Sequence, residues 1–131
     1  MDPTRAIDAA RTASTRAYAP YSNLRVGAAV LARDDTVHGG CNVENASYGL
    51  SMCAERNAVA AMVAADGEKY REVLLVAVVS PDAAPCFPCG ACRQVLHEFG
   101  CEEVITLGPS GGHLRYPLDT LLPHAFGPEV L

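Results

Sequence analysis

Three cysteines and one glutamate stand in two short motifs, and a fold that uses them together must bring both motifs to one place. The motifs are Cys53-Ala54-Glu55 and Pro88-Cys89-Gly90-Ala91-Cys92. Residues i and i+2 of a regular helix lie roughly 200° apart, so Cys53 and Glu55 can face one site only where a helix is just beginning. The sequence predicts such a start, because residues 54–65 are good helix formers and residues 47–51 are typical of a loop.

The second motif predicts another helix start, because Pro88 is followed by a helical pattern that extends from Cys89 to Phe99. Two helix N-termini would then direct their positive ends at the cysteine sulfurs. This arrangement lowers thiol pKa values and favours metal binding.

Three thiolates and a free carboxylate predict a catalytic Zn²⁺ site. Three protein ligands leave one position of a tetrahedral Zn²⁺ open for water, whereas a structural site is usually closed by four. A carboxylate beside such a water can accept its proton and pass it on. We therefore predict Zn²⁺ on Cys53, Cys89 and Cys92, with Glu55 as the proton carrier.

A second C-x-x-C overlaps the first, since Cys86 precedes Cys89 by three positions. We favour Cys89 and Cys92 as ligands, because Pro88 sets the helix start and Cys86 lies in a proline-bounded loop. Cys86 is then expected to be a thiol near the metal. As a fourth ligand it would instead close the site and make it structural.

Length and charge restrict the protein class. The chain has 131 residues, half of them hydrophobic, which predicts a single domain over residues 1–131. A net charge of -5 with scattered basic residues argues against a nucleic acid polymer as partner. The N-terminus lacks an apolar signal core and the longest apolar stretch, Val73–Val79, is too short to span a bilayer. We expect a cytoplasmic protein that does not associate with membranes.

The pattern along the chain predicts a three-layer α/β/α fold with a mixed five-stranded sheet. A helix is expected from Pro3 to a point before Pro20, with Asp2 as its cap. The expected strands are 25–32, 36–41, 73–79, 103–107 and 114–116. Alternation of apolar strands and helices places helices on both faces of the sheet.

With these residues in place, the chain resembles the small homotetrameric zinc-dependent cytidine deaminases over nearly its full length. The matching segments occur in the same order; they are residues 21–23, 26–29, 40–49, 53–56, 88–95 and 121–128. The resemblance implies a cytidine-deaminase fold and hydrolysis of cytidine and deoxycytidine to uridine, deoxyuridine and ammonia in pyrimidine salvage. It also implies attack of zinc-bound hydroxide on C4, with Glu55 moving protons to N3 and to the leaving amine.

The same resemblance implies roles for further residues. Asn42 and Glu44 would hydrogen-bond the ribose, and the backbone of Ala54 would read the base. Tyr48 and Phe126 would reach sites across subunit boundaries in a homotetramer. The alternative interpretation is that Asn42 and Glu44 only hold a turn and that the two aromatic residues only pack.

Two positions near the motif need separate comment. By resemblance, Arg56 approaches a ligating sulfur and offsets the charge of three thiolates; otherwise it would be a solvated surface charge. Leu24 stands where the family often has Phe against the pyrimidine. Leucine keeps an apolar wall but loses an aromatic stack of about 0.5–1.5 kcal/mol, so weaker substrate binding is expected.

Other functions stay open at this point. A structural zinc module would hold metal without turnover. A deaminase of another aminopyrimidine would share the zinc motif, although the segment 42–45 argues for a ribose. An editor of tRNA or single-stranded DNA is disfavoured by the charge and by the lack of additional elements for a polymer.

Overall fold

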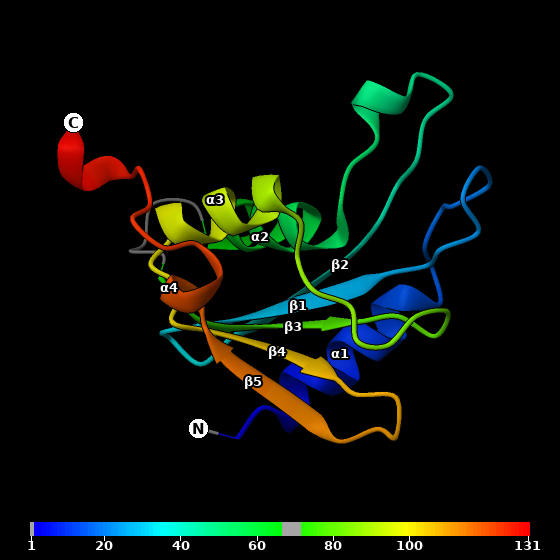
Figure 1. Cartoon of the computed structure of the whole chain (residues 1–131), viewed down its shortest axis with the longest axis horizontal. Coiled ribbons are helices and arrows are strands. Elements are labelled where there is room, and N and C mark those ends of the chain that lie inside the picture. The colour runs from blue at the N-terminus through cyan, green and yellow to red at the C-terminus, as the bar shows by residue number, and fades with distance from the viewer. Residues whose placement is uncertain (1, 67–71) are drawn as a thin grey trace.

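The computed structural model describes residues 2–66 and 72–131 and contains a five-stranded sheet between two layers of helices (Figure 1). The strands lie in the order β2-β1-β3-β4-β5. They are β1 (Gly27–Ala32), β2 (Val37–Cys41), β3 (Val73–Val79), β4 (Glu103–Leu107) and β5 (His113–Pro117). β3 and β4 are parallel and the other neighbours are antiparallel, so the predicted mixed sheet is confirmed.

Helices cover both faces of the sheet (Figure 1). One face carries α1 (Thr4–Ser14). The other carries α2 (Ala54–Asp66), α3 (Gly90–Glu98) and the short α4 (Leu118–Leu121). Two 3₁₀ turns, Tyr48–Leu50 and Pro128–Val130, lie outside these layers.

The position of β3 in the middle of the sheet explains why its sequence is apolar throughout. Leu75 and Ala77 belong to the core beneath α1, while Val76 and Val78 belong to the core beneath α2 and α3. A strand that is buried on both faces needs apolar side chains at successive positions instead of alternate ones.

Several predicted boundaries differ from the structure by one or two residues. β2 begins one residue later than predicted, and β5 extends one residue further at each end. β1 begins at Gly27 instead of Arg25, because side chains bind the two preceding amides: Asp82 accepts from Arg25 N at 2.9 Å and Asn42 from Val26 N at 2.8 Å. α1 begins at Thr4 with Pro3 as its N-cap residue instead of the predicted Asp2, although the Asp2 carboxylate accepts a hydrogen bond from Thr4 N at 3.0 Å.

Within residues 2–66 and 72–131, none of the helices has the length and apolar character that crossing a bilayer requires.

Candidate functional site

Three cysteine sulfurs meet where α2 and α3 begin. The Sγ atoms of Cys53 and Cys89 are 3.7 Å apart, and those of Cys53, Cys89 and Cys92 all lie within 4.8 Å of one another. A tetrahedral Zn²⁺ with sulfur ligands at about 2.3 Å places those sulfurs roughly 3.8 Å apart. The three predicted ligands therefore fit a zinc ion with little rearrangement.

The two helix starts have the positions that the sequence predicts. Cys53 O accepts from Asn57 N at 3.2 Å, and Cys89 O accepts from Arg93 N at 2.9 Å, so each cysteine stands at the beginning of its helix. The N–H groups of a first turn have no partners within the helix and carry partial positive charge. Both helices therefore favour negative charge at the sulfurs.

The sulfurs also shift one another's pKa values. A hydrogen bond from the Cys92 thiol is the main reason that the pKa of Cys53 falls to about 5. The same bond is the main reason that the pKa of Cys92 is raised. Of Cys53 and Cys92, Cys53 is thus the one that more readily becomes a thiolate.

Arg56 contacts the cluster, as the resemblance implies. Its Nη2 donates to Cys53 Sγ at 3.5 Å. Among the described residues, its buried Nε has no hydrogen-bond partner. Three thiolates on a divalent ion sum to one negative charge, and this guanidinium lies where it offsets that charge.

Glu55 lines the cavity that Cys53 and Cys89 also line, and it is a buried carboxylate. Glu55 is only 4% exposed. Burial raises the pKa of Glu55 to about 7. A carboxyl group that titrates near neutrality can both accept and return a proton at physiological pH, which suits a general acid and base.

A cavity of about 260 Å³ opens beside the sulfurs and Glu55. Four residues predicted to bind substrate line it, namely Leu24, Asn42, Glu44 and Ala54. Sequence reasoning did not assign its other wall residues, which are Val26, Ser51, Met52 and Phe87. Phe87 lies between two cysteines of the overlapping C-x-x-C, and this position is the only sequence signal for it.

Cys86 lines the same cavity but stands apart from the sulfur cluster. Its backbone amide donates to Thr106 Oγ1 at 3.1 Å. Burial raises the pKa of the Cys86 thiol to about 11. Its sulfur is not one of the three that lie within 4.8 Å of one another among the described residues. The geometry favours Cys89 and Cys92 over the overlapping pair.

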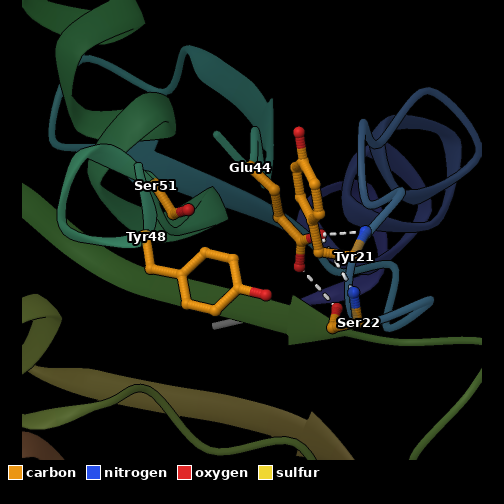
Figure 2. Close-up of a pocket in the computed structure, with 5 residues that line it drawn as sticks. All are labelled: Tyr21, Ser22, Glu44, Tyr48 and Ser51. Carbon is orange, nitrogen blue, oxygen red and sulfur yellow. Dashed lines mark hydrogen bonds between the residues drawn. The ribbon is translucent and has the colours of Figure 1, made fainter. Parts of the chain in front are cut away.

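Glu44 holds the loop that precedes β1. Its Oε1 accepts from Tyr21 N at 2.9 Å and from Ser22 N at 3.1 Å, and its Oε2 accepts from Ser22 Oγ at 2.5 Å (Figure 2). Tyr48 and Ser51 line the same hollow of about 230 Å³. A carboxylate offers about four acceptor positions, so Glu44 keeps capacity for one further donor.

Asn42 holds the same loop nearer to β1. Its Oδ1 accepts from Val26 N at 2.8 Å and its Nδ2 donates to Leu24 O at 2.8 Å. Asn42 and Glu44 therefore both hold the loop that precedes β1, which differs from the turn after their own strand that the sequence left open.

Tyr48 and Phe126 do not line the cavity that contains Glu55. Tyr48 is 74% exposed and lies on the segment between β2 and α2, which projects from the body of the molecule in Figure 1. Phe126 is 63% exposed, and its carbonyl accepts a hydrogen bond from Gln94 Nε2 at 2.7 Å.

We expect Cys89→Ser and Cys86→Ser to differ sharply in zinc content. Loss of the Cys89 ligand should weaken zinc binding by more than the roughly 10- to 100-fold that loss of an outer-shell partner causes. Cys86→Ser should retain the zinc of the wild type. Metal analysis by mass spectrometry after dialysis against a weak chelator measures both. Loss of zinc from Cys86→Ser would show that Cys86 is a ligand.

Comparison with known proteins agrees with this geometry. Residues 2–107 match the sequence model described as the cytidine and deoxycytidylate deaminase zinc-binding region. A cytidine deaminase of Sporosarcina psychrophila is 42% identical over 100% of this chain and 96% of its own length. One from Halalkalibacterium halodurans is 44% identical over 98% of this chain and 97% of its own.

Solved structures of cytidine deaminases are also similar to this chain. A cytidine deaminase from Burkholderia pseudomallei has a TM-score of 0.85 and 45% identity, covering 96% of this chain and 100% of that one. The enzyme from Mycobacterium tuberculosis has a TM-score of 0.83 and 42% identity, covering 97% and 98%. The sulfur cluster, the sheet topology and these likenesses agree, and the chain belongs to the cytidine and deoxycytidylate deaminase zinc-binding family.

Proposed function

We propose that this protein is a zinc-dependent hydrolase that deaminates cytidine and deoxycytidine to uridine and deoxyuridine, with release of ammonia, in pyrimidine nucleoside salvage. The observation that carries the proposal is the buried carboxylate of Glu55 beside three sulfurs that fit Zn²⁺, at the wall of a cavity. The relatives named cytidine deaminase, which match over nearly the full length, support the choice of substrate.

The proposed chemistry divides between the metal and Glu55. Cys53, Cys89 and Cys92 would hold Zn²⁺, a Lewis acid that would lower the pKa of bound water toward neutrality. Glu55 takes a proton from the attacking water and delivers it to ring N3, then takes a second proton from the new hydroxyl group on C4 and delivers it to the amino group, which leaves as ammonia. Because burial places its pKa at about 7, neither the uptake nor the release of the proton is strongly uphill at neutral pH.

The cavity wall suggests how a nucleoside is held. The unpaired N–H groups at the start of α2 include that of Ala54, which can donate to the carbonyl of a pyrimidine. Asn42 and Glu44 stand at the cavity with remaining hydrogen-bonding capacity for ribose hydroxyls. Leu24 offers an apolar surface for the ring.

The chemistry of the cavity also favours a nucleoside over a nucleotide. Among the described residues that line it there is no lysine or arginine to neutralise a phosphate. Ultraviolet spectra should therefore show conversion of cytidine and deoxycytidine but little conversion of deoxycytidylate. Faster turnover of deoxycytidylate than of deoxycytidine would contradict this assignment.

We expect Leu24→Phe to lower KM for cytidine about 2- to 10-fold with kcat nearly unchanged, because an aromatic stack adds about 0.5–1.5 kcal/mol of binding. Steady-state kinetics measure the effect, and Leu131→Phe at the exposed C-terminus is the matched control. An unchanged KM in Leu24→Phe would mean that this side chain does not lie against the base.

We also propose a homotetramer in which Tyr48 and Phe126 complete sites of neighbouring subunits. Large exposed aromatic side chains on projecting segments support this, because such residues are enriched at interfaces. A single continuous sheet supports one domain over residues 1–131. A site of three thiolates needs reduced cysteines, which supports a location in the cytoplasm.

A further inference from the structure

Two loops contribute neighbouring parts of the cavity wall. The first, residues 21–26, leads into β1 and supplies Leu24 and Val26. The second, residues 80–89, leads from β3 to α3 and supplies Cys86, Phe87 and the zinc ligand Cys89. The shape of the cavity depends on how these two loops are held relative to each other.

An ion pair joins the two loops. The Asp82 carboxylate accepts three hydrogen bonds from Arg25: from the backbone N at 2.9 Å, from Nε at 3.0 Å and from Nη2 at 2.9 Å. The hydrogen bond from the Arg25 side chain is the main reason that the pKa of Asp82 falls to about 2. Asp82 is therefore ionised throughout the physiological range.

Ser80 completes the connection from the same loop. Its Oγ donates to Arg25 O at 2.5 Å and accepts from Asp82 N at 3.1 Å. The backbone of Arg25 is thus bound at both its N–H and its carbonyl. Since Leu24 is the preceding residue, the 80–82 segment restrains its position at the cavity, in addition to the bonds of Leu24 itself to Asn42 and Ser22.

Most ion pairs at a protein surface contribute little, because solvent screens them and side-chain entropy opposes them. This pair differs in having a two-pronged guanidinium–carboxylate geometry and an additional bond to the main chain. Asn42 and Glu44 hold the 21–26 loop from the β2 side, whereas Arg25–Asp82 holds it from the side of the zinc-binding loop. The two sets of contacts are complementary.

We propose that Arg25 and Asp82 are positioning residues for deamination, which set the place of Leu24 relative to the zinc-binding loop and so determine how tightly the pyrimidine is held. This inference rests on the proposed function. Glu55 and the sulfurs stand at the starts of α2 and α3 and not on the 21–26 loop. Breaking the pair should therefore weaken substrate binding more than it slows the chemical step.

The test compares the zinc-loaded wild type with Arg25→Ala, Asp82→Ala and the double variant. We expect KM for cytidine to rise about three- to tenfold in each single variant, with kcat changed by less than about twofold. The double variant should be no worse than either single one, because both remove the same interaction. Arg25→Lys keeps the positive charge but loses the two-pronged hydrogen bonding, so its KM should lie between those of the wild type and Arg25→Ala.

Arg5→Ala is the matched control. Arg5 forms an exposed ion pair with Asp35, with 3.1 Å between Nη1 and Oδ1, and neither residue lines the cavity. The KM of Arg5→Ala should equal that of the wild type. Zinc content and thermal midpoint are measured for every variant. If an alanine variant fails to fold, Arg25→Lys and Asp82→Asn supply the same comparison of KM with kcat.

An active wild type with unchanged KM in both single variants would overturn the proposal and leave the function standing. Additive losses in the double variant, or equal falls of kcat and zinc content, would also overturn it, because they indicate independent or global damage. A folded, zinc-loaded wild type that converts neither nucleoside would overturn the proposed function itself, and the positioning role with it.

Discussion

Replacing Glu55 by Gln is expected to lower kcat for cytidine by about 10²- to 10⁴-fold, the range that general acid–base catalysis contributes. Gln keeps the size and shape of the side chain but can neither take up nor release a proton at neutral pH. Glu55 is not one of the three clustered ligands, so zinc should remain bound. Turnover is followed by the ultraviolet spectrum of cytidine, at equal zinc content in both proteins.

Glu98→Gln provides the matched control, because Glu98 is exposed at the end of α3. It makes the same chemical change outside the cavity and should leave kcat as in the wild type. A folded Glu55→Gln protein that holds zinc and keeps more than about a tenth of the wild-type kcat would exclude Glu55 as the proton carrier.

Gly40→Ala is expected to destabilise the fold by about 3 kcal/mol or more, at the upper end of what overpacking costs. A Cβ on Gly40 would lie 2.4 Å from Ala58 N and 2.8 Å from Ala54 O. Both are backbone atoms of α2, so no single side chain can move aside. The helix that begins at the sulfur cluster would have to shift, and zinc affinity should fall together with stability.

The neighbouring Gly39 gives an internal control on the same strand. A Cβ there would meet nothing closer than 3.8 Å. Gly39→Ala carries the same change in strand propensity and unfolded-state entropy, so the difference between the two variants reports the clash with α2. Chemical denaturation with matched zinc measures it. Equal stability of the two variants would contradict this account of the packing.

The sulfur cluster was predictable because metal ligation and helix geometry restrict each other. Cys53 and Glu55 can share a site only at a helix start, and the structure begins α2 at Ala54. The apolar run of Val73–Val79 likewise predicted a strand with both faces covered, and these are the bounds of β3. The sequence alone predicts an element or a site correctly where all the residues that determine it lie within one short segment.

Sequence reasoning was less successful where the partner is distant in the chain. The strand predicted from Arg25 begins two residues later, because the amide of Arg25 pairs with a carboxylate 57 positions away. Asn42 and Glu44 were assigned to the ribose, yet in the structure their side chains also hold the 21–26 loop. No pattern within either segment indicates such side-chain to backbone contacts.

The central claim is tested most directly by a time course of uridine and ammonia formation from cytidine, with zinc-loaded, zinc-stripped and zinc-restored wild-type protein. We predict equal amounts of uridine and ammonia from the loaded protein, loss of turnover on stripping, and its return with Zn²⁺. Absence of conversion by folded protein with zinc on Cys53, Cys89 and Cys92 would contradict the account, as would full turnover by the stripped protein.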